Sequence, residues 1–130
     1  MKKYLTIVVL ALVAAVAFGA SAKKQAEIKF SESTFDFGVI AEHGGPVSHS
    51  FSFTNTGDAN LVILDAKADC GCTEPQYPEQ PIAPGKSGKI KVTFKPIYRP
   101  GPFTKVITVK TNGKQKKVRL KITGTVNPNK

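Results

Sequence analysis

Apolar and polar residues alternate with a period of two along most of the chain after residue 26. Between residues 47 and 54 one parity holds Val47, His49, Phe51 and Phe53, and serine or threonine occupies every position of the other parity. Such alternation puts successive side chains on opposite faces of a strand, so this segment is predicted to be half buried. Other segments with apolar residues at alternate positions supply the remaining predicted core residues, which are Ile28, Phe30, Phe35, Phe37, Val39, Ile90, Val92, Phe94, Phe103, Ile107, Val109, Val118, Leu120, Ile122 and Val126. The apolar run Leu61-Val62-Ile63-Leu64 is predicted to begin a further strand.

Turn-forming residues separate these segments. Asn55-Thr56-Gly57-Asp58 ends one of them, and Asn112-Gly113 predicts a hairpin with a type I′ turn. Residues 74–88 contain four prolines and are predicted to form one long connection. Seven or eight short strands in about 100 residues predict an all-β fold, an immunoglobulin-like antiparallel β-sandwich.

The first residues of the chain predict an export signal. Met1-Lys2-Lys3 is basic, an apolar run extends to Phe18, and Gly19-Ala20-Ser21-Ala22 offers small residues that signal peptidases accept. The apolar run of about 15 residues is shorter than the roughly 18–20 that a membrane-spanning helix needs, which favours cleavage after Ala22 over a retained anchor.

The expected organisation is therefore a cleavable signal peptide over residues 1–22 and one immunoglobulin-like domain over residues 23–130, with its core in residues 26–126. We expect the mature protein in the periplasm or outside the cell, with no stable membrane span after cleavage.

Composition narrows the class of protein. The chain has 130 residues, 41% of them hydrophobic, which is too apolar for a disordered polyelectrolyte and too short for a multidomain enzyme. Its two cysteines are too few for a small scaffold held together by disulfides. The solvent-facing side of a predicted strand accounts for Ser48, Ser50 and Ser52, so they are not candidate nucleophiles. The sequence has no nucleophile elbow and no phosphate-binding loop. We therefore predict that the protein is not an enzyme.

Charge is distributed unevenly. Residues 23–79 contain four lysines and nine acidic residues, a net charge of −5, whereas residues 80–130 carry +13. Two rows of cations alternate with core positions and should point outward: Lys89, Lys91 and Lys95, and Lys117, Arg119 and Lys121. The rows form one basic face if their strands share a sheet; otherwise each sheet carries one row.

Two interpretations of these cations remain open. In the first, they dock the protein on an anionic envelope component, such as lipid phosphates, acidic glycans or an acidic protein. Alternatively they provide solubility and protect edge strands from aggregation. Nucleic acid is not a predicted partner, because the chain is exported and the rows lack interleaved aromatic residues.

The Cys70-Gly71-Cys72 element has three interpretations. In an extended strand its Cα atoms would lie about 6.6 Å apart, at the outer limit for a disulfide, unless Gly71 lets the backbone contract. A bridge over so short a loop would contribute only about 1.6 kcal/mol. The sulfurs could simply pack at the end of the sandwich, bind copper or zinc with His43 or His49 as a further ligand, or take part in thiol–disulfide exchange.

Nearby charge bears on that choice. Asp65, Asp69 and Glu74 outnumber Lys67 around the cysteines. A negative environment disfavours thiolates and favours a bound cation, which puts metal binding ahead of exchange. Away from the cysteines, His49 shares its parity with core residues and is predicted to lie at the core edge, whereas His43 is predicted to be solvated.

Several motifs occur in an order that resembles a known family. They are Phe35-Asp36-Phe37-Gly38, Phe51-Ser52-Phe53-Thr54-Asn55-Thr56-Gly57, Cys70-Gly71-Cys72-Thr73, Ile82-Ala83-Pro84-Gly85-Lys86-Ser87-Gly88, Gly101-Pro102-Phe103 and Ile122-Thr123-Gly124. Over residues 30–126 the chain resembles domain-of-unknown-function family 1573, secreted bacterial proteins with an immunoglobulin-like sandwich related to the ASH and major-sperm-protein-like modules. The resemblance implies the fold and export, and it transfers no activity.

These observations together predict a non-catalytic binding or assembly module of the bacterial cell envelope with an unidentified partner. The alternatives are a soft-metal protein that binds copper or zinc through Cys70 and Cys72, and a thiol–disulfide exchange module.

Overall fold

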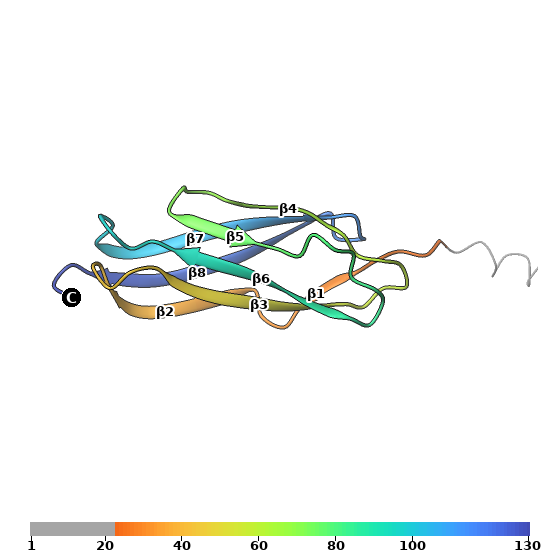
Figure 1. The fold of residues 1–130 in the computed structure, drawn as a ribbon, viewed down its shortest axis with the longest axis horizontal. Helices are drawn as coiled ribbons and strands as arrows, with labels where there is room; N and C mark the ends of the chain where they lie inside the picture. The colour runs from red at the N-terminus through yellow and green to blue at the C-terminus, as the bar shows by residue number, and fades with distance from the viewer. Residues whose placement is uncertain (1–22) are drawn as a thin grey trace, which may run out of the picture.

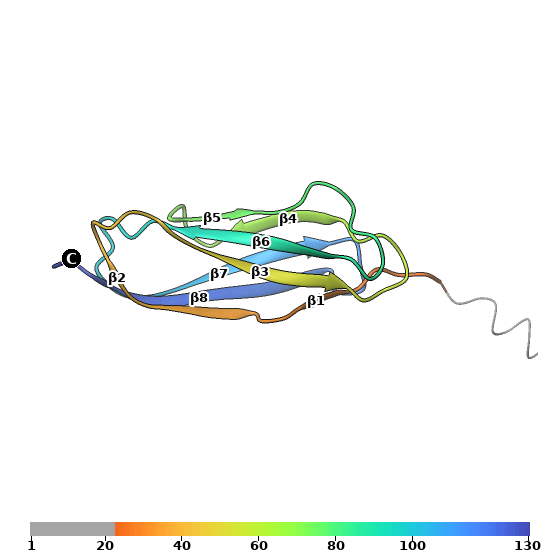
Figure 2. The same cartoon turned by 60° about the horizontal axis from the view of Figure 1, so that its bottom comes forward.

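The computed structural model describes residues 23–130, so the predicted signal peptide lies outside it. This part of the chain contains eight strands and no helix (Figures 1 and 2). The strands are β1 (Ile28–Phe30), β2 (Thr34–Ala41), β3 (Val47–Asn55), β4 (Ile63–Ala68), β5 (Thr73–Gln76), β6 (Ser87–Phe94), β7 (Gly101–Thr111) and β8 (Lys117–Asn127). None of residues 23–130 belongs to a helix that is long and apolar enough to cross a membrane.

The strands form two four-stranded sheets that pack face to face. One sheet has the order β1-β3-β6-β5 and the other β2-β8-β7-β4. Alternate residues of each strand enter the space between the sheets, where Phe51, Phe53 and Phe94 are fully buried with aliphatic residues of β6, β7 and β8. The β-sandwich prediction is therefore confirmed. Phe103 is buried as well, whereas Phe30, Phe35 and Phe37 are partly buried and pack against the core.

One pairing differs from the predicted antiparallel arrangement. Strand β2 pairs with β8 in parallel, whereas the other five pairings in the described chain are antiparallel. Only residues 31–33 separate β1 from β2, and they carry the chain from one sheet to the other without reversing it (Figure 2). Since β2 keeps the direction of β1, it meets β8 in parallel.

Two apolar residues of the predicted strands face solvent, and one of them, Val39, was predicted to lie on the core face. The β2–β8 register shifts between Asp36 and Val39, where Gly38 has a φ of 71° and donates its N–H to Asp36 Oδ1 at 2.8 Å. This bulge inverts the alternation, so Val39 is exposed and Ile40 packs against the core. A second irregularity, between Ile63 and Asp65 in β4, accompanies the exposure of Leu64.

The predicted hairpin is confirmed by the antiparallel pairing of β7 with β8, but its turn type was wrong, as was the extent of the long proline-rich connection. Residues 112–116 form a five-residue connection between β7 and β8, and Gly113 has no positive φ, so there is no type I′ turn. Glycine is needed there because a Cβ would lie 2.6 Å from the Ala26 carbonyl oxygen. In the stretch 74–88, expected to be one connection, residues 87–88 begin β6 and residues 74–76 belong to edge strand β5. Pro75 is tolerated in β5 because only one side of the strand is paired.

Candidate functional site

Three loops and the C-terminus meet at one end of the sandwich, and the coloured part of the ribbon begins at the opposite end (Figure 1). The loops are residues 42–46 between β2 and β3, 69–72 between β4 and β5, and 95–100 between β6 and β7. Strand register brings them together, because Val47 and Thr73 both pair with Phe94. We call this region the loop end.

The 95–100 loop presents large apolar side chains to solvent. Ile97 is 47% exposed and Tyr98 is 87% exposed. A hydrogen bond from the Arg99 N–H to the Pro96 carbonyl oxygen, 3.1 Å long, closes the turn that carries them. Tyr98 has a φ of 61°, a left-handed conformation that is unfavourable for a bulky residue and that is associated with functional sites.

A recess of about 420 Å³ lies beside this turn, between the 42–46 and 95–100 loops. Pro46, Pro96 and Ile97 give it apolar walls, and Glu42 contributes a carboxylate. Glu42 is only 8% exposed, and its Oε2 lies 3.2 Å from Nε2 of the exposed His43. Lys95 also lines the recess, which therefore combines apolar surface with a shielded carboxylate and a cation.

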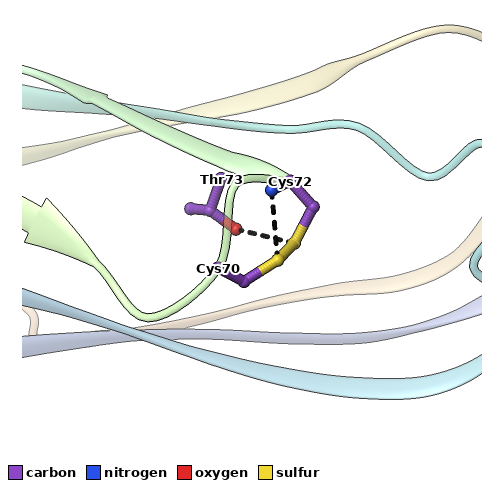
Figure 3. The surroundings of a disulfide bond; sticks show 3 residues. All are labelled: Cys70, Cys72 and Thr73. Carbon is purple, nitrogen blue, oxygen red and sulfur yellow. Dashed lines mark hydrogen bonds between the residues drawn. A yellow bond between two sulfur atoms is a disulfide. The ribbon is translucent and has the colours of Figure 1, made fainter.

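Cys70 and Cys72 are joined by a disulfide in the 69–72 loop (Figure 3). Their Cα atoms lie 5.3 Å apart, so the backbone has contracted from the extended spacing. Cys72 is buried in the core at 3% exposure, whereas Cys70 is partly exposed at its edge. The Cys72 N–H donates to Cys70 Sγ at 3.1 Å, and the Thr73 hydroxyl lies 3.6 Å from Cys72 Sγ.

The soft-metal hypothesis applies only to the reduced pair, since a disulfide offers no thiolate to copper or zinc. Within residues 23–130, no group of three or more His, Cys, Asp and Glu side chains is arranged to hold a metal ion. His43 contacts Glu42 instead, and His49 contacts Glu32. His49 also stacks on Phe35 of the opposite sheet with ring centroids 3.7 Å apart, which confirms its predicted place at the core edge.

The two cationic rows lie in different sheets. Lys89 and Lys91 are on β6 and Lys95 follows it, whereas Lys117, Arg119 and Lys121 are on β8. All six are exposed, but no single basic face forms; each sheet carries one row.

The two rows differ in how their charges are compensated. Lys95 Nζ lies 2.8 Å from Glu74 Oε1. In the described chain no carboxylate lies within 4.0 Å of the β8 row, and Lys110 of β7 stands directly opposite Lys117. The β8 row therefore carries the less compensated charge.

Sequence reasoning singled out the 69–72 loop and missed the 95–100 loop and Glu42. A signal was present, since Ile97 and Tyr98 are large apolar residues between the prolines of a connection. Because these two residues lie outside every predicted strand, their side chains are not expected to be buried in the core. Glu42 gave no signal, because its burial depends on loops that are distant in sequence.

A family model described as "Protein of unknown function (DUF1573)" matches residues 28–126. A search of curated proteins found no match.

Solved structures with a similar fold come from bacteria and human. A protein of unknown function from Porphyromonas gingivalis W83 has 17% identity and a TM-score of 0.68, with 83% of this chain and 50% of that chain covered. The ASH/PapD-like domain 7 of human CEP192 has 11% identity and a TM-score of 0.60, covering 84% and 92%. The Escherichia coli chaperone DraB has 11% identity and a TM-score of 0.54, covering 79% and 56%. The chain thus spans about half the length of the Porphyromonas protein, and these similarities establish the fold alone.

Proposed function

The chain belongs to the DUF1573 family, whose function is unknown, and we propose that it is a non-catalytic binding or assembly module exported to the bacterial cell envelope. The predicted signal peptide supports export. The chain shares its fold with chaperones such as DraB, which supports a protein as the partner. This support comes from the shared architecture alone.

The observation that carries the proposal is the exposed pair Ile97 and Tyr98 on a turn with a left-handed residue. Exposed tyrosines on ordered turns supply large contact area at low entropic cost, and they are enriched among the residues that dominate binding energy. The neighbouring recess would receive an apolar side chain of the partner, and Glu42 would pair with a cationic group beside it.

The test measures binding of the purified protein to envelope proteins extracted from the producing bacterium. A double variant, Ile97→Ser with Tyr98→Gly, removes the apolar tip and relaxes the backbone at position 98, so the fold should persist. We expect its affinity to fall at least about tenfold.

Leu64→Ser is the matched control, because Leu64 is 58% exposed and lies on β4 away from the 95–100 loop. It should bind as the wild type does. If the double variant also keeps wild-type affinity while its unfolding is unchanged, the loop end is not the binding surface.

A second candidate function is electrostatic docking on an anionic envelope component through β8. The observation that favours it is the unpaired row Lys117, Arg119 and Lys121 with Lys110 beside it. Like charges directly opposite one another destabilise a sheet. Because no carboxylate offsets this cost, the cationic cluster is better explained by binding to an anion than by stability of the fold.

Vesicles containing phosphatidylglycerol test this candidate. Reversing the β8 row to glutamate should abolish binding, whereas reversing Lys89, Lys91 and Lys95 should weaken it less. Wild-type binding should also fall steeply as salt rises. Equal losses in both triple variants, or binding indifferent to salt, would count against a specific β8 surface.

A further inference from the structure

The Cys70–Cys72 bridge differs in the environment of its two sulfurs, and from this we propose that it is a thiol–disulfide exchange site. In this proposal Cys70 forms the mixed disulfide and Cys72 is the leaving thiolate. The inference goes beyond partner binding and does not depend on the identity of any partner.

The two sulfur-bearing residues differ in their exposure to solvent. Cys72 is 3% exposed and belongs to the core cluster, whereas Cys70 is partly exposed between the exposed residues Asp69 and Gly71. No heavy atom lies within 4 Å of the position that a Cβ on Gly71 would take, so the turn is open on that side. An incoming thiolate therefore reaches Cys70 before Cys72.

The two sulfurs also have different hydrogen-bond donors (Figure 3): the Cys72 N–H donates to Cys70 Sγ at 3.1 Å, whereas a side-chain hydroxyl lies beside Cys72 Sγ. The Thr73 hydroxyl lies 3.6 Å from Cys72 Sγ and is positioned to donate to a thiolate formed there. A donor aimed at the sulfur that leaves stabilises the charge that develops when the S–S bond breaks. Thr73 is thus a positioning residue for the leaving group.

In the folded protein the charge around the two cysteines is less negative than the sequence alone indicates. The acids around Cys70 and Cys72 appeared to disfavour thiolates, but β5–β6 pairing brings Lys95 to Glu74 with 2.8 Å between Nζ and Oε1. That pair neutralises one of the acids nearest to Cys72 in sequence. The main objection to exchange is therefore weaker in the folded protein.

The chemistry balances with a dithiol as reductant. A substrate thiolate attacks Cys70 Sγ, the Cys70–Cys72 bond breaks, and its electron pair remains on Cys72 as a thiolate. The second substrate thiolate then attacks the substrate sulfur of the mixed disulfide and releases Cys70 as a thiolate. Two electrons pass to the cysteine pair, the substrate becomes a disulfide, and the two protons of the substrate thiols pass through solvent to the cysteines.

Backbone bonds hold the turn independently of the bridge. The Thr73 N–H donates to the Cys70 carbonyl oxygen at 3.2 Å, the Lys95 N–H to the Cys72 carbonyl oxygen at 2.9 Å, and the Asp69 N–H to the Val106 carbonyl oxygen at 3.2 Å. Reduction should therefore leave the sandwich folded, which exchange under native conditions requires.

Single-cysteine variants of the full chain test the asymmetry, with oxidised glutathione as the probe and intact mass as the readout. Cys72→Ser leaves Cys70 free, and we expect it to acquire glutathione at least tenfold faster than Cys70→Ser does. Equal rates in the two folded variants, or a faster reaction at Cys72, would overturn the assignment.

A second measurement uses the intact pair. Under native conditions reduced glutathione should open the bridge, and an acid quench should trap a glutathione adduct whose peptide map locates it on Cys70. Thr73→Val should slow opening about tenfold, and Thr73→Ser, which keeps the hydroxyl, should restore the rate. A bridge that stays closed to glutathione in the folded wild type, or Thr73→Val reacting at the wild-type rate, would contradict the proposal.

Discussion

Asn55 is the residue whose role was least visible in the sequence. Its side chain is fully buried and accepts hydrogen bonds from the N–H groups of Gly57 at 3.0 Å and Glu27 at 3.3 Å. Its amide also donates to the carbonyl oxygens of Ala59 at 2.7 Å and Ile82 at 2.9 Å. Sequence reasoning predicted the local turn, but not these links to residues 28 and 27 positions away, because they exist only once the sheets are assembled.

We expect Asn55→Ala to lower the free energy of unfolding by about 3 kcal/mol, because it leaves buried backbone groups without partners. Urea denaturation measures the change. Asn129→Ala, at an exposed C-terminal position, is the control and should stay within about 0.5 kcal/mol of the wild type. A loss below about 1 kcal/mol at Asn55 would show that water replaces the amide.

Glycines facing aromatic rings form a second test at the residue scale. A Cβ on Gly124 would lie 2.7 Å from Phe103 Cζ and 3.0 Å from the Gly38 carbonyl oxygen. Gly124→Ala should therefore cost about 1–3 kcal/mol by overpacking. Gly71→Ala, which meets no atom within 4 Å, should change the unfolding midpoint little in the same assay. Similar costs at both positions would argue against close packing of Phe103 on Gly124.

At the scale of elements, period-two alternation predicted the strands wherever neighbours on both sides keep a regular register. It failed at Val39, where a register irregularity turns the side chain outward. It also missed β5, because an edge strand that contains Pro75 needs no alternating pattern. The parallel direction of β2 arises because residues 31–33 lead the chain from one sheet to the other. No local sequence pattern predicts such a crossing.

The β7–β8 pairing allows a prediction for an element. Lys110 and Lys117 stand directly opposite each other, so Lys117→Glu should replace repulsion by attraction. We expect stabilisation of about 0.2–1 kcal/mol at low salt, fading as salt screens the pair. Lys89→Glu, opposite the neutral Ser52, should gain less. Equal gains from both substitutions would show that only net charge matters.

At the scale of the whole molecule, stability resides in the two apolar layers, and the loop end is available for interactions. Its composition was only partly predictable. The cysteine pair was evident in the sequence, whereas the recess requires the 42–46 and 95–100 loops to meet, which the sheet order decides. The same order separates the two cationic rows.

The bridge should matter little for global stability, since it closes a loop with a sequence separation of 2. Reduction should lower the free energy of unfolding by at most about 1.6 kcal/mol. Denaturation with and without reductant measures this loss. Complete unfolding on reduction would mean that the bridge is a structural requirement.

The central claim is that the loop end contacts a partner in the envelope. Its most direct test is photo-crosslinking in living cells that produce the full chain, with a benzophenone amino acid at position 98, at position 64 on β4, or at position 114 at the opposite end. We predict a discrete crosslinked product from position 98 alone. Products of equal yield from positions 64 or 114, or none from position 98 in folded protein, would contradict the account.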